Sequence, residues 1–271
     1  MTKRHLILPD TQCRKGDPVR HFEWVAQAIN DYKPDVVIHL GDHWDFPSLS
    51  SYDGPGTLKM EGARVQDDIE AGNATMRILR DGITHKCKKI LLRGNHENRQ
   101  NKAINKDPRL VGTLGDHLLE SPGWQVVPYY AGAPGQITVD GVVYSHFFPV
   151  PNTGKPIGGT IQNRLQKIGQ SFVHGHVQGL MQGTHQFATG RTIQGIQSGS
   201  LYLHDEDFKG PANRHWRGIV VLNEVQNGSF CEMPLSVDYL CRKYEGISVS
   251  RYLNKNFKNA KERFSLARSD T

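Results

Sequence analysis

Three short apolar runs in the first hundred residues constrain the fold more than any other feature of this chain. They read LILPD at 6–10, VVIHLGD at 36–42 and ILLRGNH at 90–96, and each ends in polar residues. Continuous apolar runs of this length are typical of strands that are buried on both faces of a sheet. Apolar residues at helical spacing over 18–32 and 58–82 separate the runs. The order β-α-β-α-β predicts a parallel sheet that is covered by helices.

The second half of the chain has a different pattern, in which short strands follow one another closely. We predict strands at 124–128, 136–140, 142–146, 171–174, 185–189, 192–198, 217–223 and 229–234. A helix is expected over 158–168, and no repeat or linker separates the two halves. We therefore expect a large domain over 1–235 and a basic C-terminal extension over 236–271 that is helical.

The composition excludes several classes of protein. The chain of 271 residues is long enough for a sizeable core, and no stretch approaches the roughly 18 apolar residues of a membrane helix. Asp10 interrupts the first apolar run too early for a secretory leader, so we expect a cytoplasmic protein without membrane partners. The four cysteines form no CxxC pair, which argues against a disulfide framework. The net charge of +6 permits a polyanionic substrate but does not require one.

Five predicted strands end in residues that can bind a metal ion. In chain order these are Asp10 with Gln12, Asp42, Asn95 with His96, His146, and His174 with His176. One histidine after a strand is more often a structural residue than a ligand. Five strand ends that combine carboxylate, amide and imidazole are hard to explain by core packing, because buried Asp and His are costly unless they are paired or bound to metal. The set predicts a metal site.

These motifs resemble those of the calcineurin-like metallophosphoesterase superfamily. The superfamily order D-x-H, G-D-x-x-D, G-N-H-E, H and G-H-x-H is matched over residues 10–176 by Asp10-Thr11-Gln12, Gly41 to Asp45, Gly94 to Glu97, His146, and Gly175 between His174 and His176. Two later stretches, QSGSLY at 197–202 and HWRGIVVL at 215–222, are similar to phage-encoded members. The resemblance implies an α/β fold, a four-layer αββα sandwich of two mixed β-sheets flanked by helices. A phage-encoded member would act in the host cytoplasm.

The resemblance also implies a site with two divalent metal ions. The first ion would take Asp10, Gln12, Asp42 and His176, and the second would take Asp42, Asn95, His146 and His174. Such ions lie roughly 3.5–4 Å apart, and a hydroxide that they hold would attack phosphorus. His96 would act near the leaving group as a general acid or stabilise phosphoryl charge, and Asp45 would orient it.

Two residues depart from the superfamily pattern. Gln12 replaces the usual histidine of the first motif, and an amide oxygen is a harder ligand than imidazole. Manganese is therefore the expected metal, with magnesium, iron, nickel and zinc as alternatives. Phe46 stands where phosphoprotein phosphatases of the superfamily have an arginine that binds phosphate, which argues against a phosphoserine phosphatase.

The predicted activity is a metal-dependent phosphoesterase, and a phosphodiesterase acting on nucleotides or nucleic acid is favoured. Arg93, Arg99 and Lys155 are candidate substrate contacts, with a solvated side chain as the alternative for the two arginines and an idle one for Lys155. One alternative is a phosphomonoesterase that acts on a small molecule or a protein. Another is a weakly active phosphate-binding or nucleic-acid-binding module, which only Gln12 favours. The retention of His96 and Asp45 argues against such a module. The oligomeric state stays open.

Overall fold

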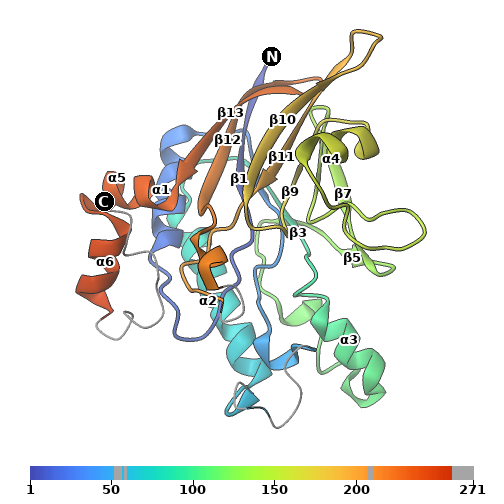
Figure 1. Cartoon of the computed structure of the whole chain (residues 1–271). Coiled ribbons are helices and arrows are strands. Elements are labelled where there is room, and N and C mark those ends of the chain that lie inside the picture. The colour runs from blue at the N-terminus through green and yellow to red at the C-terminus, as the bar shows by residue number, and fades with distance from the viewer. Residues whose placement is uncertain (52–56, 58–59, 207–209, 258–271) are drawn as a thin grey trace.

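The computed structural model describes residues 1–51, 57, 60–206 and 210–257. Its larger sheet has six strands in the order β13-β12-β1-β2-β3-β4 (Figure 1). In chain order the strands are β1 (Lys3–Leu8), β2 (Val36–His39), β3 (Lys88–Leu92), β4 (Gln125–Val127), β12 (Gly218–Gln226) and β13 (Ser229–Ser236). The first four pair in parallel, whereas β12 and β13 pair antiparallel. The predicted β-α-β-α-β half is therefore confirmed, and two late strands extend its sheet.

The second sheet has five strands in the order β10-β11-β9-β8-β7. In chain order these are β7 (Gln136–Val139), β8 (Val142–Ser145), β9 (Phe172–His174), β10 (Leu180–Gln186) and β11 (Thr192–Ser198). β9 is parallel to both of its neighbours, and the outer pairs are antiparallel. A separate hairpin joins β5 (Tyr129–Tyr130) and β6 (Ala133–Pro134).

The two sheets pack face to face, and helices cover their outer faces. Apolar residues of both sheets, such as Ile38 and Ile90 from one and Tyr144 and Val173 from the other, form one buried cluster. The outer face of the six-stranded sheet packs against α1 (His21–Tyr32), α2 (Val65–Gly82), α5 (Val237–Glu245) and α6 (Val249–Asn256). The other sheet packs against α4 (Ile161–Ile168). These layers confirm the predicted αββα sandwich.

Several elements differ from the prediction. The strand expected at 185–189 is β10, which begins at Leu180 and carries polar residues because it lies at the edge of its sheet. Helix α3 (Arg99–Lys106) was not predicted, since Gln100 is its one buried residue and it has no apolar stripe. The helix expected over 58–82 is α2, which begins at Val65, because residues 60–63 form a turn, and residues 58–59 lie outside the described part of the chain. None of the helices in the described ranges is long and apolar enough to cross a membrane.

The C-terminal segment is helical as far as the structure describes it. Leu240 and Cys241 of α5 and Leu253 of α6 are buried in the same cluster as Trp24 of α1. The last residues, 258–271, lie outside the described part of the chain. The division of the chain at residue 235 stays a prediction.

Candidate metal centre

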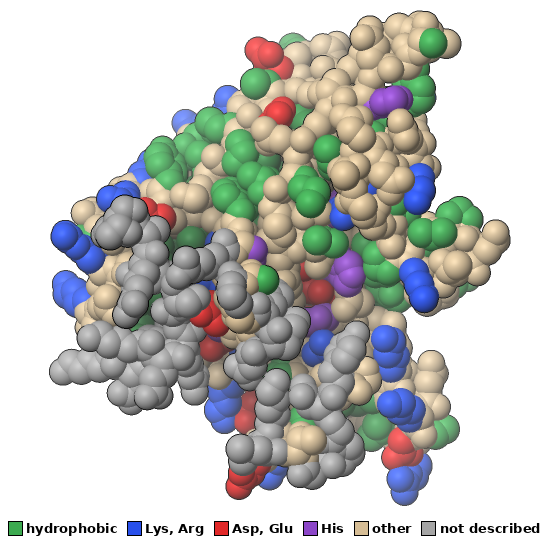
Figure 2. Space-filling view, in the orientation of Figure 1, with side chains coloured by type: hydrophobic (Ala, Val, Ile, Leu, Met, Phe, Trp, Pro, Cys, Tyr) green, Lys and Arg blue, Asp and Glu red, His purple; other side chains and the backbone are tan. Residues whose placement is uncertain are grey.

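The carboxyl ends of strands from both sheets bring three potential metal ligands together. One ligand atom each of Asp42, His146 and His176 can be chosen so that all lie within 4.8 Å of one another. The Nε2 atom of His146 lies 3.2 Å from Oδ2 of Asp42 and 2.9 Å from Oδ1 of Asn95. Figure 2 shows histidine and acidic side chains gathered on this face, in the region between α4 and α3. These three residues and Asn95 can therefore provide carboxylate, amide and imidazole donors to one position.

Backbone strain is concentrated at the same place. Gln12, Asp42, Phe46 and His176 have positive φ angles of 39°, 50°, 50° and 65°. Residues other than glycine rarely adopt this region, and strained residues of this kind cluster at functional sites. The loops after β1, β2 and β9 are thus held in conformations that present the side chains of these residues.

Gly94 and Glu97 fix the loop that carries Asp42. A Cβ atom on Gly94 would lie 2.1 Å from Oδ1 of Asp42, so only glycine allows this approach. The buried Glu97 carboxylate accepts backbone N–H groups of Asp42, His43, Trp44 and Gly94. Glu97 is therefore a structural acceptor that holds the two loops together.

Two buried oxygen atoms beside this cluster have no hydrogen-bond partner among the described residues. They are Oδ2 of Asp10 and Oε1 of Gln12, and both residues are almost completely buried. The other oxygen of Asp10 accepts the backbone N–H of His176 at 3.0 Å. Unpaired buried oxygens are costly, and a divalent cation would satisfy both. The residues present therefore fit a metal ion at this position.

The charges of the cluster are strongly coupled. Burial opposes a charge on His146, but the carboxylates of Asp42 and Asp10 outweigh it and raise the pKa of His146 to about 9. Burial likewise opposes ionisation of Asp42, and His146 and His96 outweigh it and lower the pKa of Asp42 below its usual range. Burial dominates at Asp10 and raises its pKa to about 7. Without metal, a protonated His146 thus neutralises Asp42, and a cation would replace that proton.

His96 lies at the rim of the cluster within a chain of charged side chains. Its Nδ1 atom lies 2.5 Å from Oδ1 of Asp45, and its Nε2 atom lies 3.6 Å from Oδ2 of Asp42. The other oxygen of Asp45 is paired with Arg14, which in turn lies 2.7 Å from Glu206. Burial lowers the pKa of His96, but Asp42 and Asp45 outweigh burial and raise it.

Arg14 and Glu206 were not identified from the sequence. Arg14 follows Gln12 by two residues, and this position in the first motif was the one available signal. Glu206 is separated from Arg14 by 192 residues, so no local pattern could reveal it.

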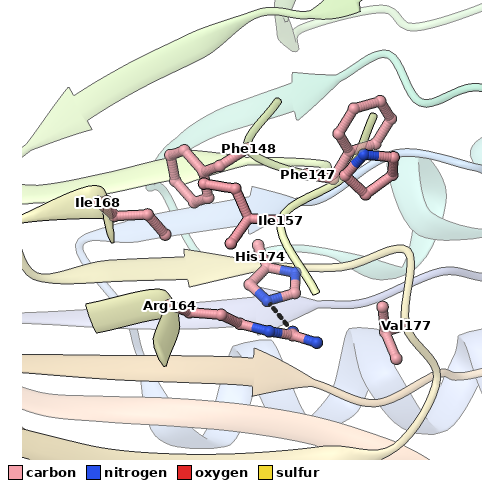
Figure 3. A pocket seen from close by; sticks show the side chains of 8 residues that line it. Phe147, Phe148, Ile157, Arg164, Ile168, His174 and Val177 are labelled. Atoms are coloured by element: carbon pink, nitrogen blue, oxygen red, sulfur yellow. Dashed lines mark hydrogen bonds between the residues drawn. The ribbon is translucent and has the colours of Figure 1, made fainter. Parts of the chain in front are cut away.

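His174 lies beside Arg164 and a group of apolar side chains, as Figure 3 shows. The Nη1 atom of Arg164 donates to its Nε2 at 2.6 Å, and Nδ1 lies 2.7 Å from the Gly175 carbonyl oxygen. The His174 ring stacks on Phe172, which packs against α4, whereas Val173 points between the sheets. Burial and then Arg164 lower the pKa of His174 to about 3. Both of its nitrogens are therefore occupied within the protein, and its assignment as a metal ligand stays a prediction.

The three candidate substrate contacts lie in different environments. Arg93 is 2% exposed and its guanidinium lies over the Trp44 ring, so it is part of the core beside the site. Arg99 donates to the carbonyls of Asp45 and Phe46, and its Nη2 lies 3.1 Å from Nε2 of His96. Lys155 is exposed in the loop between β8 and α4.

The fold and this cluster define the class of protein as a metal-dependent hydrolase built on two facing β-sheets. The chain belongs to the calcineurin-like phosphoesterase family, whose model matches residues 4–192. Members of this family are hydrolases that use divalent metals to cleave phosphate esters. The family expected from the sequence motifs is therefore confirmed.

Relatives of this chain occur in phages. It is 30% identical over 188 residues to the Gene 54 protein of Mycobacterium phage D29, covering 65% of this chain and 69% of that protein. The same identity and coverage apply to the Gene 54 protein of Mycobacterium phage L5. Both matches support the expectation of a phage-encoded member.

Two solved structures resemble the chain more distantly. The TT1561 protein of Thermus thermophilus is 9% identical with a TM-score of 0.36, covering 88% of this chain and 100% of that one. The NAD nucleotidase of Haemophilus influenzae is 13% identical with a TM-score of 0.36, covering 87% and 50%.

Proposed function

We propose that this chain is a two-metal phosphodiesterase that acts on nucleotides or nucleic acid. The observation that carries the proposal is the cluster of Asp42, His146 and His176 beside the partnerless oxygens of Asp10 and Gln12, with His96 at its rim. The donors come from six residues, which is more than an ion that keeps positions open for water and substrate needs. They divide naturally into two groups that share Asp42.

One ion would be held by Asp42, Asn95, His146 and His176, whose donor atoms lie together. The other would be held by the oxygens of Asp10, Gln12 and Asp42. This division differs from the one expected from the sequence. His176 would bind the same ion as His146, and His174 would pair with Arg164 instead of binding metal. The second set contains only oxygen donors, which favour manganese or magnesium over zinc, so manganese remains the proposed metal.

The ions would supply Lewis-acid stabilisation of phosphoryl charge and would lower the pKa of a water molecule. The residues of the chain would do the rest. His96, with its raised pKa, would hold a proton on Nε2 and donate it to the leaving oxygen once substrate displaces Arg99, whose Nη2 lies 3.1 Å from that atom. Asp45 accepts from Nδ1 of His96 and so leaves Nε2 facing the site.

Preference for diesters is supported by the surroundings of Phe46. This residue is completely buried, and it occupies the position where an arginine would bind the second charge of a phosphomonoester. Among the residues that the structure describes, Arg99 is the cation in contact with His96, and its guanidinium already donates to two backbone carbonyls. A substrate with one phosphate charge fits these donors better than one with two.

Hydrolysis of bis-p-nitrophenyl phosphate beside p-nitrophenyl phosphate tests the proposal. The protein is chelated, manganese is added back, and Asp42→Asn serves as the blank. Metal-dependent cleavage that is faster for the diester is expected. Faster cleavage of the monoester would establish a phosphomonoesterase instead. Bound metal without cleavage of either would favour a binding module.

A further inference from the structure

A groove leads away from the candidate metal centre along α3. Its volume is about 170 Å³, and it begins at Asn95, whose Oδ1 contacts His146. One wall is formed by Leu49, Ser50 and Ser51, and the other wall is formed by Arg99, Lys102, Ala103 and Lys106. The groove is therefore continuous with the place where the phosphodiester would be cleaved.

The α3 wall presents three cations on one helical face. Arg99, Lys102 and Lys106 are spaced i, i+3 and i+7, and residues with this spacing lie along one side of a helix. Lys102 and Lys106 are exposed, and no ion pair joins them to a carboxylate of the described residues. Figure 2 shows Lys and Arg side chains gathered over α3.

Helix α3 contributes little to the hydrophobic core. Gln100 is its one buried residue, and Oε1 of Gln100 accepts the backbone N–H of Gly115 at 3.0 Å. A short helix without an apolar face adds little to stability by burial. Packing therefore does not explain the composition of α3, and its cationic face beside the groove points to a binding role.

We propose that this groove binds the backbone phosphates on one side of the scissile diester, so that the substrate is a polynucleotide strand. The proposal rests on the proposed phosphodiesterase function and narrows its substrate class. Seven residues of helix span about 10 Å, which is long enough to face more than one backbone phosphate of a strand. None of the described lining residues is aromatic, so contacts to phosphate and little sequence preference are expected.

The test removes two lysines that do not touch the proposed catalytic residues. Lys102→Ser/Lys106→Ser is compared with Lys86→Ser/Lys88→Ser, which makes the same charge change at the opposite end of β3, where both lysines are also exposed. Arg99 is left intact because it contacts His96. The substrates are bis-p-nitrophenyl phosphate and a labelled single-stranded DNA of about 16 nucleotides.

The groove variant should lose about tenfold in kcat/KM for the oligonucleotide through a higher KM, with the small diester unaffected. Binding of the same DNA to proteins that also carry Asp42→Asn is followed by anisotropy at several salt concentrations. The slope of log Kd against log salt should become shallower by about 1.4, or about 0.7 for each lost phosphate contact. The Lys86/Lys88 variant should match the parent protein.

Equal losses in both lysine variants would overturn the groove proposal, as would an unchanged salt slope in the Lys102/Lys106 variant. In either case, cleavage of the small diester would leave the proposed function intact. If the parent protein cleaves neither substrate, the proposed function fails, and the salt slope still tests DNA binding in the groove. If the Lys102/Lys106 variant loses as much kcat/KM for a phosphopeptide as for the DNA, the assignment to polynucleotides is overturned.

Discussion

The Nδ1 atom of His96 lies 2.5 Å from Oδ1 of Asp45, and the second oxygen of Asp45 is held by Arg14. This contact fixes the ring so that Nε2 faces Asp42 at 3.6 Å. A carboxylate that holds one imidazole nitrogen orients the other toward the site, where Nε2 also lies 3.1 Å from Nη2 of Arg99. The relationship gives His96 a defined orientation before any substrate binds.

Asp45→Asn should therefore lower kcat about 100-fold, the lower end of what general acid catalysis contributes. The loss should be larger for aryl diesters with poor leaving groups, because these need the proton most. A leaving-group series measured for the parent and the variant at saturating manganese checks this. An equal loss for all leaving groups would mean that Asp45 acts on folding or metal binding rather than through His96.

Gln12→His should tighten metal binding at the position of Asp10 and Gln12. Imidazole is a stronger ligand for manganese and zinc than an amide oxygen, so a gain on the order of tenfold is expected at one of the two sites. Calorimetric titration of the chelated proteins measures it, and Gln12→Ala is the matched control that should bind more weakly. Unchanged affinity in the histidine variant would contradict the assignment of Gln12 as a ligand.

His174→Ala and His176→Ala should have opposite effects. Loss of His174 leaves the buried Arg164 with Gln197 as its remaining side-chain acceptor, so the free energy of unfolding should fall by about 1–2 kcal/mol while metal content is retained. Loss of His176 should remove metal with little change in the stability of the chelated protein. Urea unfolding and metal analysis of both variants provide the comparison. Metal loss in the His174 variant would support the ligand role expected from the sequence.

His21 should make the protein sensitive to acid. It is buried with no hydrogen-bond partner for either nitrogen among the described residues, and burial lowers its pKa to about 3. The unfolded chain takes up a proton near pH 6.5, whereas the folded chain resists protonation until about pH 3. The contribution of neutral His21 to stability is therefore complete above about pH 6.5 and is lost as the pH falls toward about 3.

His21→Leu should reduce this loss by on the order of a few kcal/mol between about pH 6.5 and 3. Urea unfolding at several pH values measures it, with the exposed His117→Gln as the control. A parallel decline in the parent and in His21→Leu would show that other groups cause the acid sensitivity.

The amino-acid sequence alone determined the parallel half of the fold and much of the candidate site. Buried strands have a local signature, and the rule that parallel strands align their carboxyl ends places Asp10, Asp42 and Asn95 at one edge. These features depend on short-range periodicity and on connection rules, which a single sequence carries.

Only the tertiary structure decided which of these side chains lie in contact with one another. Alternation along β9 turns His174 toward Arg164 of α4, while the strained backbone at His176 brings that ring to Asp42. Arg14 meets Glu206 across 192 residues, and Arg93 is buried against the Trp44 ring. Helix α3 carries no apolar period, so its cationic face could be located only in the folded chain. Such contacts join segments that are distant in sequence, and their geometry is set by how sheets and helices pack, not by any local pattern.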